Sequence, residues 1–207
     1  MGSSRPRNAA ATREAILQSA IRHFALSGYD GVGVREIAGD AGVTAMLVNR
    51  YFGSKEQLFA EAVETSFAPP TIVAEEPAAL ARDAAAALAE RSDPDADPLE
   101  PFLIMLRSVS NPVAVNIVRD AIARHVGRRL VGQLSGPDRQ LRADAMLSVM
   151  SGVLLMRRVI RSPGFADCDT DQLTDLFERV FSAIIEPASG PGSVRSGRRR
   201  SVRRLSP

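Results

Sequence analysis

The stretch that decides the fold is residues 33–52, which read GVREIAGDAGVTAMLVNRYF. Apolar residues recur at helical spacing over residues 34–41 and again over residues 45–52. Between them, Gly42 permits a tight reversal of the chain, and Thr44 is a residue type that caps the start of a helix. Two short helices joined by a glycine-containing turn predict a helix-turn-helix unit.

The second of these helices is expected to have an inner and an outer face. We predict that Leu47 is buried, that Val48 is partly buried, and that Val43 fills the angle between the two helices. The outer face then carries Ala45, Met46, Asn49 and Arg50. The first two of these side chains leave room for the helix to approach base edges in a major groove, and amide and guanidinium groups hydrogen-bond bases or phosphates. The pattern therefore predicts a DNA-reading helix.

Helical patterns on both sides of this unit complete a first domain. A helix beginning at Thr12 places an apolar residue at every fourth position and ends at Gly28. A further helix follows Ser54 and ends before Pro69 and Pro70. We predict a DNA-binding domain over residues 12–68, in which the first three helices form the helix-turn-helix domain and the fourth completes it, and a flexible arm over residues 1–11.

The rest of the chain is also helical by pattern, and we find no stretch that alternates with the period of a strand. Further helices are expected near residues 77–91, 99–108, 112–134, 138–160 and 170–186. The fold class is therefore all-α, with a second helical domain over residues 77–186 for ligand binding and dimerisation. Residues 187–207 are rich in Ser, Gly, Pro and Arg without an apolar face, which predicts a disordered basic tail.

Composition narrows the class of protein. The 207 residues are 45% hydrophobic and 24% charged, and they include one Cys, which excludes a disulfide framework and fits a reducing compartment. No apolar run reaches the ~20 residues that a bilayer crossing needs, so we expect a cytoplasmic protein with no membrane partner. The net charge is +3 over residues 1–55, −7 over 56–186 and +6 over 187–207. Basic ends around an acidic middle favour contact of the ends with a polyanion.

The first domain resembles the DNA-binding domain of the tetracycline-repressor (TetR) family. The matching segments are TREAIL at 12–17, Phe24, Gly28-Tyr29, VREIA at 34–38, AGVT at 41–44, Tyr51-Phe52 and SKEQL at 54–58. The resemblance implies an all-helical homodimer that binds a double-stranded DNA operator and releases it when a small-molecule effector enters the C-terminal domain. It also implies that Tyr51 and Lys55 are phosphate partners and that Thr44 is both cap and DNA contact.

The sequence departs from the family at two positions. Asn49 stands where the family usually has a Tyr that touches the DNA backbone, and the residues near Gly33 lack the usual Thr that caps the next helix. These departures affect the details of backbone contact and not the fold. The predicted DNA-binding set is Arg35, Thr44, Ala45, Met46, Asn49, Arg50, Tyr51 and Lys55. The alternative for Arg35 and Arg50 is that they are solvated surface charges.

Large apolar residues of the second domain are candidates for an effector pocket, because such pockets combine apolar walls with a few polar groups. The predicted effector-binding set is Phe102, Met105, Leu106, Asn116, Met146, Met150 and Phe177, with Arg107, Asn111 and His125 as further polar candidates. The alternative is that the apolar members are simply core.

Other site chemistry is not predicted. The spacing of Asp167, Asp169 and Asp171 imitates a calcium loop, but Gln172 stands where that loop needs a Gly. We expect no metal, no cofactor and no enzymatic activity, since the sequence carries no catalytic motif.

The sequence-level hypothesis is thus a ligand-responsive regulator of transcription, a repressor, that dimerises through residues 138–160 and 170–186. Twofold symmetry would then require a palindromic operator. The alternative hypothesis is a helical small-molecule-binding protein in which the helix-turn-helix is only scaffold.

Overall fold

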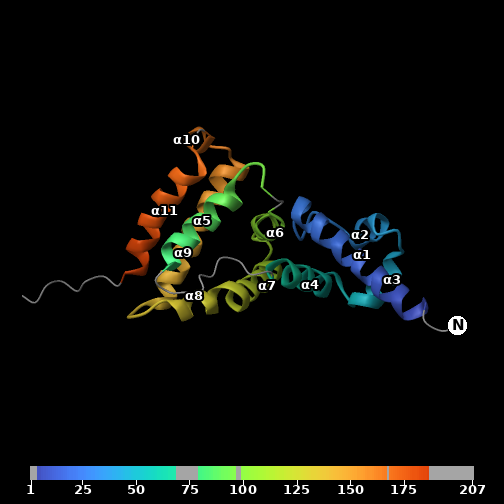
Figure 1. Ribbon diagram of the computed structural model, residues 1–207. Helices are drawn as coiled ribbons and strands as arrows, with labels where there is room; N and C mark the ends of the chain where they lie inside the picture. Colours follow the sequence, from blue (N-terminus) through green and yellow to red (C-terminus); the bar gives the residue numbers. More distant parts are fainter. Residues whose placement is uncertain (1–3, 69–78, 97–98, 167, 187–207) are drawn as a thin grey trace, which may run out of the picture.

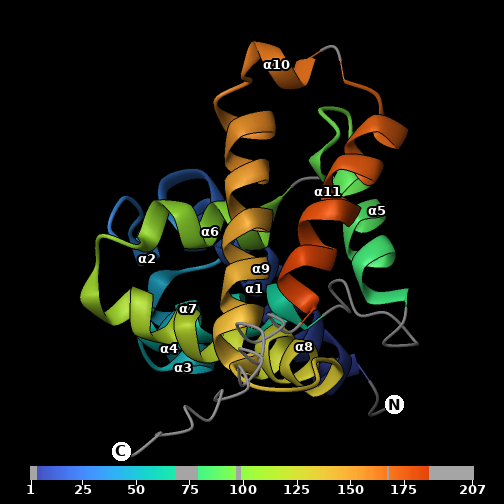
Figure 2. The same cartoon turned by 90° about the vertical axis from the view of Figure 1, so that its left-hand side faces the viewer.

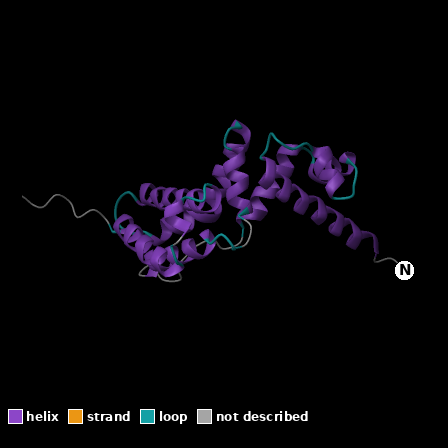
Figure 3. Ribbon diagram, turned by 90° about the horizontal axis from the view of Figure 1, so that it is seen from above, coloured by secondary structure: helices purple, strands orange, loops and turns teal. Residues whose placement is uncertain are grey.

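The computed structural model describes residues 4–68, 79–96, 99–166 and 168–186, and every regular element within these ranges is a helix (Figures 1 and 3). The helices are α1 (Ser4–Ser27), α2 (Val34–Asp40), α3 (Ala45–Phe52), α4 (Lys55–Phe67), α5 (Leu80–Ser92), α6 (Glu100–Ser108), α7 (Pro112–Ile122), α8 (Arg128–Gln133), α9 (Arg139–Leu154), α10 (Pro163–Ala166) and α11 (Thr170–Ile185). Two π-helical turns, Ala123–Gly127 and Leu155–Val159, continue α7 and α9. The all-α prediction is confirmed.

The start of α1 differs from its prediction. The helix begins at Ser4 instead of Thr12, so most of the segment predicted as a flexible arm is helical. Pro6 lies in the first turn, where its missing N–H is not needed, and residues 9–11 are three consecutive alanines, the strongest helix formers. The predicted tail at 187–207 and the predicted domain boundary at 69–77 lie outside the described residues.

The first hydrophobic core joins α1 to the helix-turn-helix and α4. The predicted stripe of α1 is confirmed, because Ile16, Ala20 and Phe24 are all fully buried. The Phe24 ring packs edge-on against Phe59 of α4 with 4.9 Å between ring centroids, and Tyr29 packs edge-on against Phe59 at the same distance. Edge-to-face aromatic pairs add stabilisation beyond burial alone. This aromatic cluster fixes α4 against α1.

Helices α6 and α7 pack on this first core although they follow α5 in the chain. Ile104 of α6 and Ala114, Val118 and Ala121 of α7 are buried in the same cluster as the residues of α1–α4. Figure 1 shows α6 and α7 between the N-terminal helices and the group formed by α5, α9 and α11. The two halves of the molecule therefore meet through α6 and α7.

The second core lies among α5, α8, α9 and α11. Helices α5 and α11 run side by side (Figure 2). Each presents a residue at every fourth position, and these residues are Leu80, Ala84 and Leu88 on α5 and Leu173, Phe177 and Phe181 on α11. The small alanines of α5 leave room for the phenylalanine rings of α11.

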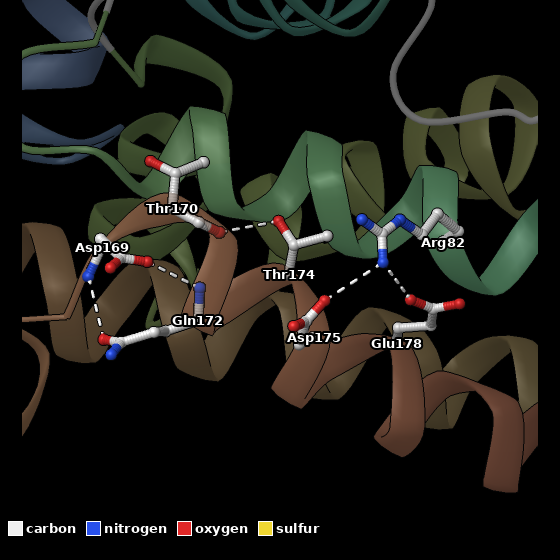
Figure 4. A network of polar contacts seen from close by, with 7 residues as sticks. All are labelled: Arg82, Asp169, Thr170, Gln172, Thr174, Asp175 and Glu178. Atoms are coloured by element: carbon white, nitrogen blue, oxygen red, sulfur yellow. Dashed lines mark hydrogen bonds and ion pairs between the residues drawn. The ribbon is translucent and has the colours of Figure 1, made fainter.

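Polar contacts align these two helices on their exposed side (Figure 4). The Arg82 guanidinium of α5 donates to Asp175 at 3.1 Å and to Glu178 at 2.7 Å, both on α11. Asp169 caps α11 by accepting the Gln172 N–H at 2.7 Å. Asp169 of the calcium-like spacing thus holds a helix end, and Asp175 and Glu178 hold ion pairs with Arg82.

One glycine permits the close approach of α6 to the end of α1. Gly28 follows α1 with φ of +70°, a conformation that residues with a Cβ rarely adopt. A Cβ built at this position would also overlap the backbone carbonyl of Arg107, the penultimate residue of α6. No larger residue fits this position without moving α6.

We predict that Gly28→Ala lowers the free energy of unfolding by about 1–3 kcal/mol, the usual cost of a strained backbone position. Gly132→Ala is the matched control, since Gly132 lies in α8 with no heavy atom within 4 Å of an added Cβ. Chemical denaturation followed by circular dichroism measures both variants. Equal stability of the two would contradict the close approach.

Candidate nucleic-acid interface and cavity

The two helices of the predicted helix-turn-helix are capped in different ways. At the start of α3 the Thr44 hydroxyl accepts the Leu47 N–H at 3.3 Å, so the predicted cap is confirmed. At the start of α2 the Gly33 N–H donates to the Glu36 carboxylate at 2.6 Å. Glu36 thereby supplies half of a capping box, which replaces the Thr that the family usually has here.

The inward face of α3 is displaced by one residue from the prediction. Val48 is buried at 1% exposure and Leu47 is only half-buried, so the predicted order of the two was wrong. Ala45 is half-buried against the first core, and Phe52 is buried. Residues 45, 48 and 52 follow the three- and four-residue steps of one helix face, and Leu47 lies beside that face.

The outer face of α3 carries three of the predicted contacts. Met46 is 81% exposed, and Asn49 and Arg50 are also exposed. Arg35 is exposed on the neighbouring α2, and Thr44 is exposed at the turn between the helices. The structure thus presents Arg35, Thr44, Met46, Asn49 and Arg50 on adjacent elements and turns Ala45 partly inward.

The arginines of this domain divide into paired and unpaired groups. Arg13 binds Glu61 and Arg22 binds Asp40, each at 2.6 Å, and Arg13 also lies 4.6 Å above the Phe52 ring centroid. Within the described residues, Arg35 and Arg50 have no hydrogen-bond or ion-pair partner. The two paired arginines hold α1 to α4 and to α2, whereas the two unpaired arginines keep their charge available to a ligand.

Lys55 and Tyr51 lie at the junction of α3 and α4. Ser54 caps α4 by accepting the Gln57 N–H at 3.1 Å, and Lys55 is the first residue of the helix. The Lys55 ammonium lies 4.7 Å from the centroid of the Tyr29 ring. Burial, with the negative charges of Glu56 and Asp30, raises the pKa of Tyr29, so the ring is uncharged at neutral pH. Tyr51 is half-buried against the first core.

A cavity of about 600 Å³ lies on the other side of α6, bordered by α4, α5, α7, α8 and α9. Its apolar lining residues are Phe67, Leu88, Ala96, Leu99, Pro101, Phe102, Met105, Ile122, Val126, Leu130, Leu147, Met150 and Leu154, and its polar lining residues are Ser66, Glu90, Arg91, Glu100 and Ser151. A volume of 300–1,000 Å³ with this composition is typical of small-molecule sites.

Three residues of the predicted effector set line this cavity, namely Phe102, Met105 and Met150. The other four do not. Met146 is fully buried in the second core, and Phe177 packs beside Phe181 there. Asn116 is exposed and accepts a hydrogen bond from Arg119, and Leu106 is half-buried on α6 away from the lining.

The polar groups of the cavity were missed by the sequence analysis. They come from α4, α5, α6 and α9, so no local pattern groups them. Ser66 is notable because its hydroxyl is buried without a hydrogen-bond partner. A buried hydroxyl without a partner costs free energy that a ligand's hydrogen bond can recover.

The predicted polar candidates instead connect the two halves of the molecule. Arg107 of α6 donates to the Ala25 carbonyl, and the Ser108 hydroxyl accepts the Tyr29 N–H at 3.0 Å. Asn111 donates to Asp30 at 2.9 Å. Since α6 also carries Phe102 and Met105, one helix contacts both the cavity and the end of α1.

A second connection joins α4 to the π-helical turn after α7. Glu64 of α4 lies 2.8 Å from Arg124 and 2.6 Å from the Nε2 atom of His125. The hydrogen bond from Arg124, followed by that from His125, lowers the pKa of Glu64 below its usual 4.5. The carboxylate is therefore charged at neutral pH.

No group of His, Cys, Asp or Glu in the described ranges is placed to hold a metal ion. Over the same ranges, no helix has the length and apolar character needed to cross a bilayer.

An exposed helix-turn-helix is joined to a helical domain with a cavity. Together they define the class of the protein, a helix-turn-helix regulator with an appended ligand-binding domain. Residues 16–62 match the model of bacterial regulatory proteins of the tetR family, and residues 78–185, just over half of the chain, match the tetracyclin repressor-like C-terminal domain. The chain belongs to the TetR family.

Individual relatives agree with this assignment. Over 82 residues the chain is 37% identical to the HTH-type transcriptional regulator BetI of Agrobacterium fabrum, an alignment that spans 40% of this chain and about a third (35%) of that relative. A TetR-family regulator from Streptomyces coelicolor A3 superposes with a TM-score of 0.54 at 26% identity, covering 89% of this chain and 99% of that one. The multidrug binding protein EbrR complexed with ethidium has a TM-score of 0.64 at 21% identity, covering 85% and 99%, and shows the same fold.

The ion pairs of Glu64 predict a pH dependence of stability. Because its pKa is lower in the folded protein, Glu64 contributes stability above pH 4.5 that is lost as the pH falls through the folded-state value. We expect Glu64→Gln to cost about 0.5 kcal/mol at pH 7, since both partners are partly solvated. In denaturation curves, the difference in free energy of unfolding between Glu64→Gln and the wild type should shrink to zero as the pH falls below 4.5. A difference that persists unchanged in acid would exclude the ion pairs as its cause.

Proposed function

We propose that the chain is a cytoplasmic transcriptional repressor that binds a palindromic DNA operator as a homodimer and leaves it when a small molecule occupies the cavity. The observation that carries the proposal is the pair of unpaired guanidinium groups, Arg35 and Arg50, beside Asn49 on the outer faces of α2 and α3. An exposed helix with Asn and Arg on its outer face fits a major groove, where these groups read base edges. The proposal assigns no catalytic step to the chain.

Dimer formation is proposed from the outer face of α9 and α11. Leu141 of α9 is 68% exposed, Ile160, directly after the π-helical turn that continues α9, is 59% exposed, and Leu176 of α11 is 42% exposed. Figure 2 shows α9 and α11 on the side of the molecule that faces the viewer, with no helix covering them. A second copy on this face would form a four-helix interface and bury these side chains. The two α3 helices would then lie about 34 Å apart, one turn of DNA.

Release is proposed to be a shift between two spacings of the α3 helices. An effector in the cavity causes release only if it binds the conformation that cannot engage DNA more tightly than it binds the DNA-binding conformation. Helix α6 supports this coupling because it contacts both the cavity and the end of α1. The similar EbrR structure, which is complexed with ethidium, supports the proposal that this fold admits a small organic molecule.

We predict that Arg50→Ala weakens binding to duplex DNA from upstream of the protein's own gene by about tenfold, since one base or phosphate contact contributes ~1–3 kcal/mol. Arg35→Ala should weaken it as well. Arg22→Ala is the matched control, because Arg22 is bound to Asp40 and should leave DNA affinity unchanged. Fluorescence anisotropy at several salt concentrations measures all three.

Random duplex DNA is the second control for this experiment. The proposal requires wild-type affinity for the specific fragment to exceed that for random DNA at every salt concentration. If the two affinities are equal, or if Arg50→Ala and Arg22→Ala behave alike, the helix-turn-helix serves as scaffold only.

We predict that Leu176→Arg converts the protein from dimer to monomer at micromolar concentration, because a charge would have to enter the apolar interface. Leu26→Arg is the matched control, since Leu26 is 68% exposed on α1, and α1 lies on the other side of α6 from α9 and α11 (Figure 1). Sedimentation velocity measures the mass of both. A wild type that sediments as a monomer would overturn the dimer, and so would a dimeric Leu176→Arg variant.

A further inference from the structure

A second cavity, of about 410 Å³ and open to solvent on one side, lies against the first. It is bordered by α6, α7, the π-helical turn and the N-terminal half of α9. Its lining residues are Met105, Val109, Val115, Val118, Arg119, Ile122, Ala123, Gly127, Gln140, Asp144 and Leu147. Its volume alone is within the range of small-molecule sites.

Three side chains line both cavities, namely Met105 of α6, Ile122 of α7 and Leu147 of α9. Each is only half-buried although it packs against one of the two cores, because each borders both cavities. They form the partition between the two spaces. Met105 has three rotatable bonds and a soft thioether, so this partition can open by changes of side-chain rotamer.

The charged groups of the two cavities differ in their partners. In the first cavity Glu90 and Glu100 have no ion-pair partner among the described residues, and Arg91 is the one guanidinium in its lining. In the second cavity Asp144 accepts a hydrogen bond from Gln140 at 3.0 Å, and Arg119 donates to Asn116 at 2.9 Å. None of Glu90, Glu100, Asp144 and Arg119 has an ion-pair partner among the described residues. With Arg91 counted, the lining of the first cavity carries one net negative charge, whereas Asp144 and Arg119 balance each other in the second.

We propose that the two cavities form one channel for a linear aliphatic cation. Its ammonium group lies beside Glu90 and Glu100 in the first cavity, and its hydrocarbon chain passes Met105 and Leu147 into the second. A compact molecule fills only the first cavity, whereas an unbranched chain gains apolar burial in both. The role of this ligand as an effector rests on the proposed function, but its binding does not.

Gly127 allows the second cavity to be closed by one substitution. It lines only the second cavity, its φ of −58° suits any residue, and an added Cβ would meet nothing closer than the Ile122 carbonyl at 3.5 Å. Gly127→Leu therefore fills this cavity without backbone strain. Gly132→Leu is the matched control, since Gly132 is exposed on α8 and lines neither cavity. Val115→Phe fills the same cavity from α7 and serves as a second variant if Gly127→Leu does not fold.

The test is calorimetric titration of the full chain with n-alkyltrimethylammonium ions from butyl to dodecyl, below their micelle concentrations. Each buried methylene lowers the dissociation constant about fourfold, so wild-type affinity should rise steadily with chain length. In Gly127→Leu the short members should bind as in the wild type, and dodecyl should bind at least tenfold more weakly. Gly132→Leu should match the wild type. The n-alkanoates of equal length should bind more weakly than the cations.

Several outcomes would overturn the channel. These are an affinity that stops rising at intermediate length in the wild type, unchanged dodecyl binding in Gly127→Leu, or alkanoates that bind as tightly as the cations. Failure of the proposed function is separately visible in the anisotropy experiment. Specific DNA binding without any alkylammonium binding would support the proposed repressor and exclude the proposed channel. Alkylammonium binding without specific DNA binding would support the channel and exclude the repressor.

Discussion

The close approach between the end of α6 and the end of α1 is the contact on which the arrangement of the molecule depends. Gly28 lets the α6 backbone come within contact distance, and the Tyr29 N–H donates to the Ser108 hydroxyl there. A formed hydrogen bond contributes little net free energy of folding, whereas a buried N–H without a partner costs more. The hydrogen bond between Tyr29 and Ser108 therefore adds little stability, but any other placement of α6 would lose it and leave the N–H without a partner. The apolar residues of α6 and α7 then supply the burial that holds the two halves together.

Packing and chain order divide the molecule at different places. The family models place residues 78–185 in one C-terminal domain, yet α6 and α7 share their hydrophobic core with α1–α4. The cavity lies where these two helices turn from the first core toward the second. A ligand in this cavity contacts helices of both cores. Because packed interiors rearrange in discrete steps and do not deform continuously, a change in the volume of the cavity must shift the helices of one core.

The sequence predicted the helix-turn-helix because its signals are local. The caps at Thr44 and Ser54 and the stripe on α1 are each set by residues within a few turns of one another, and the structure has them. The sequence predicted Leu47 as the buried residue of α3, whereas Val48, one position later, is buried. The two residues are similarly apolar, so only contacts with other helices distinguish them. For the same reason the sequence did not show which arginines are paired, because Glu61 and Asp40 are distant in the chain from Arg13 and Arg22. The cavity required four or more helices to be placed, so only three of its lining residues were identified.

The distribution of unpaired charge connects the two proposed binding sites. A charge that has no partner in a folded protein is stable only if water or a ligand solvates it. On α2 and α3 the unpaired groups are guanidinium ions that face solvent, whereas in the first cavity they are carboxylates. Groups of these opposite signs attract opposite ligands, so a polyanion is drawn to the helix-turn-helix and repelled from the cavity. The net charges of +3 over residues 1–55 and −7 over residues 56–186 extend the same separation over residues 1–186. The separation keeps DNA from competing for the cavity and a cation from competing for the DNA-facing helices.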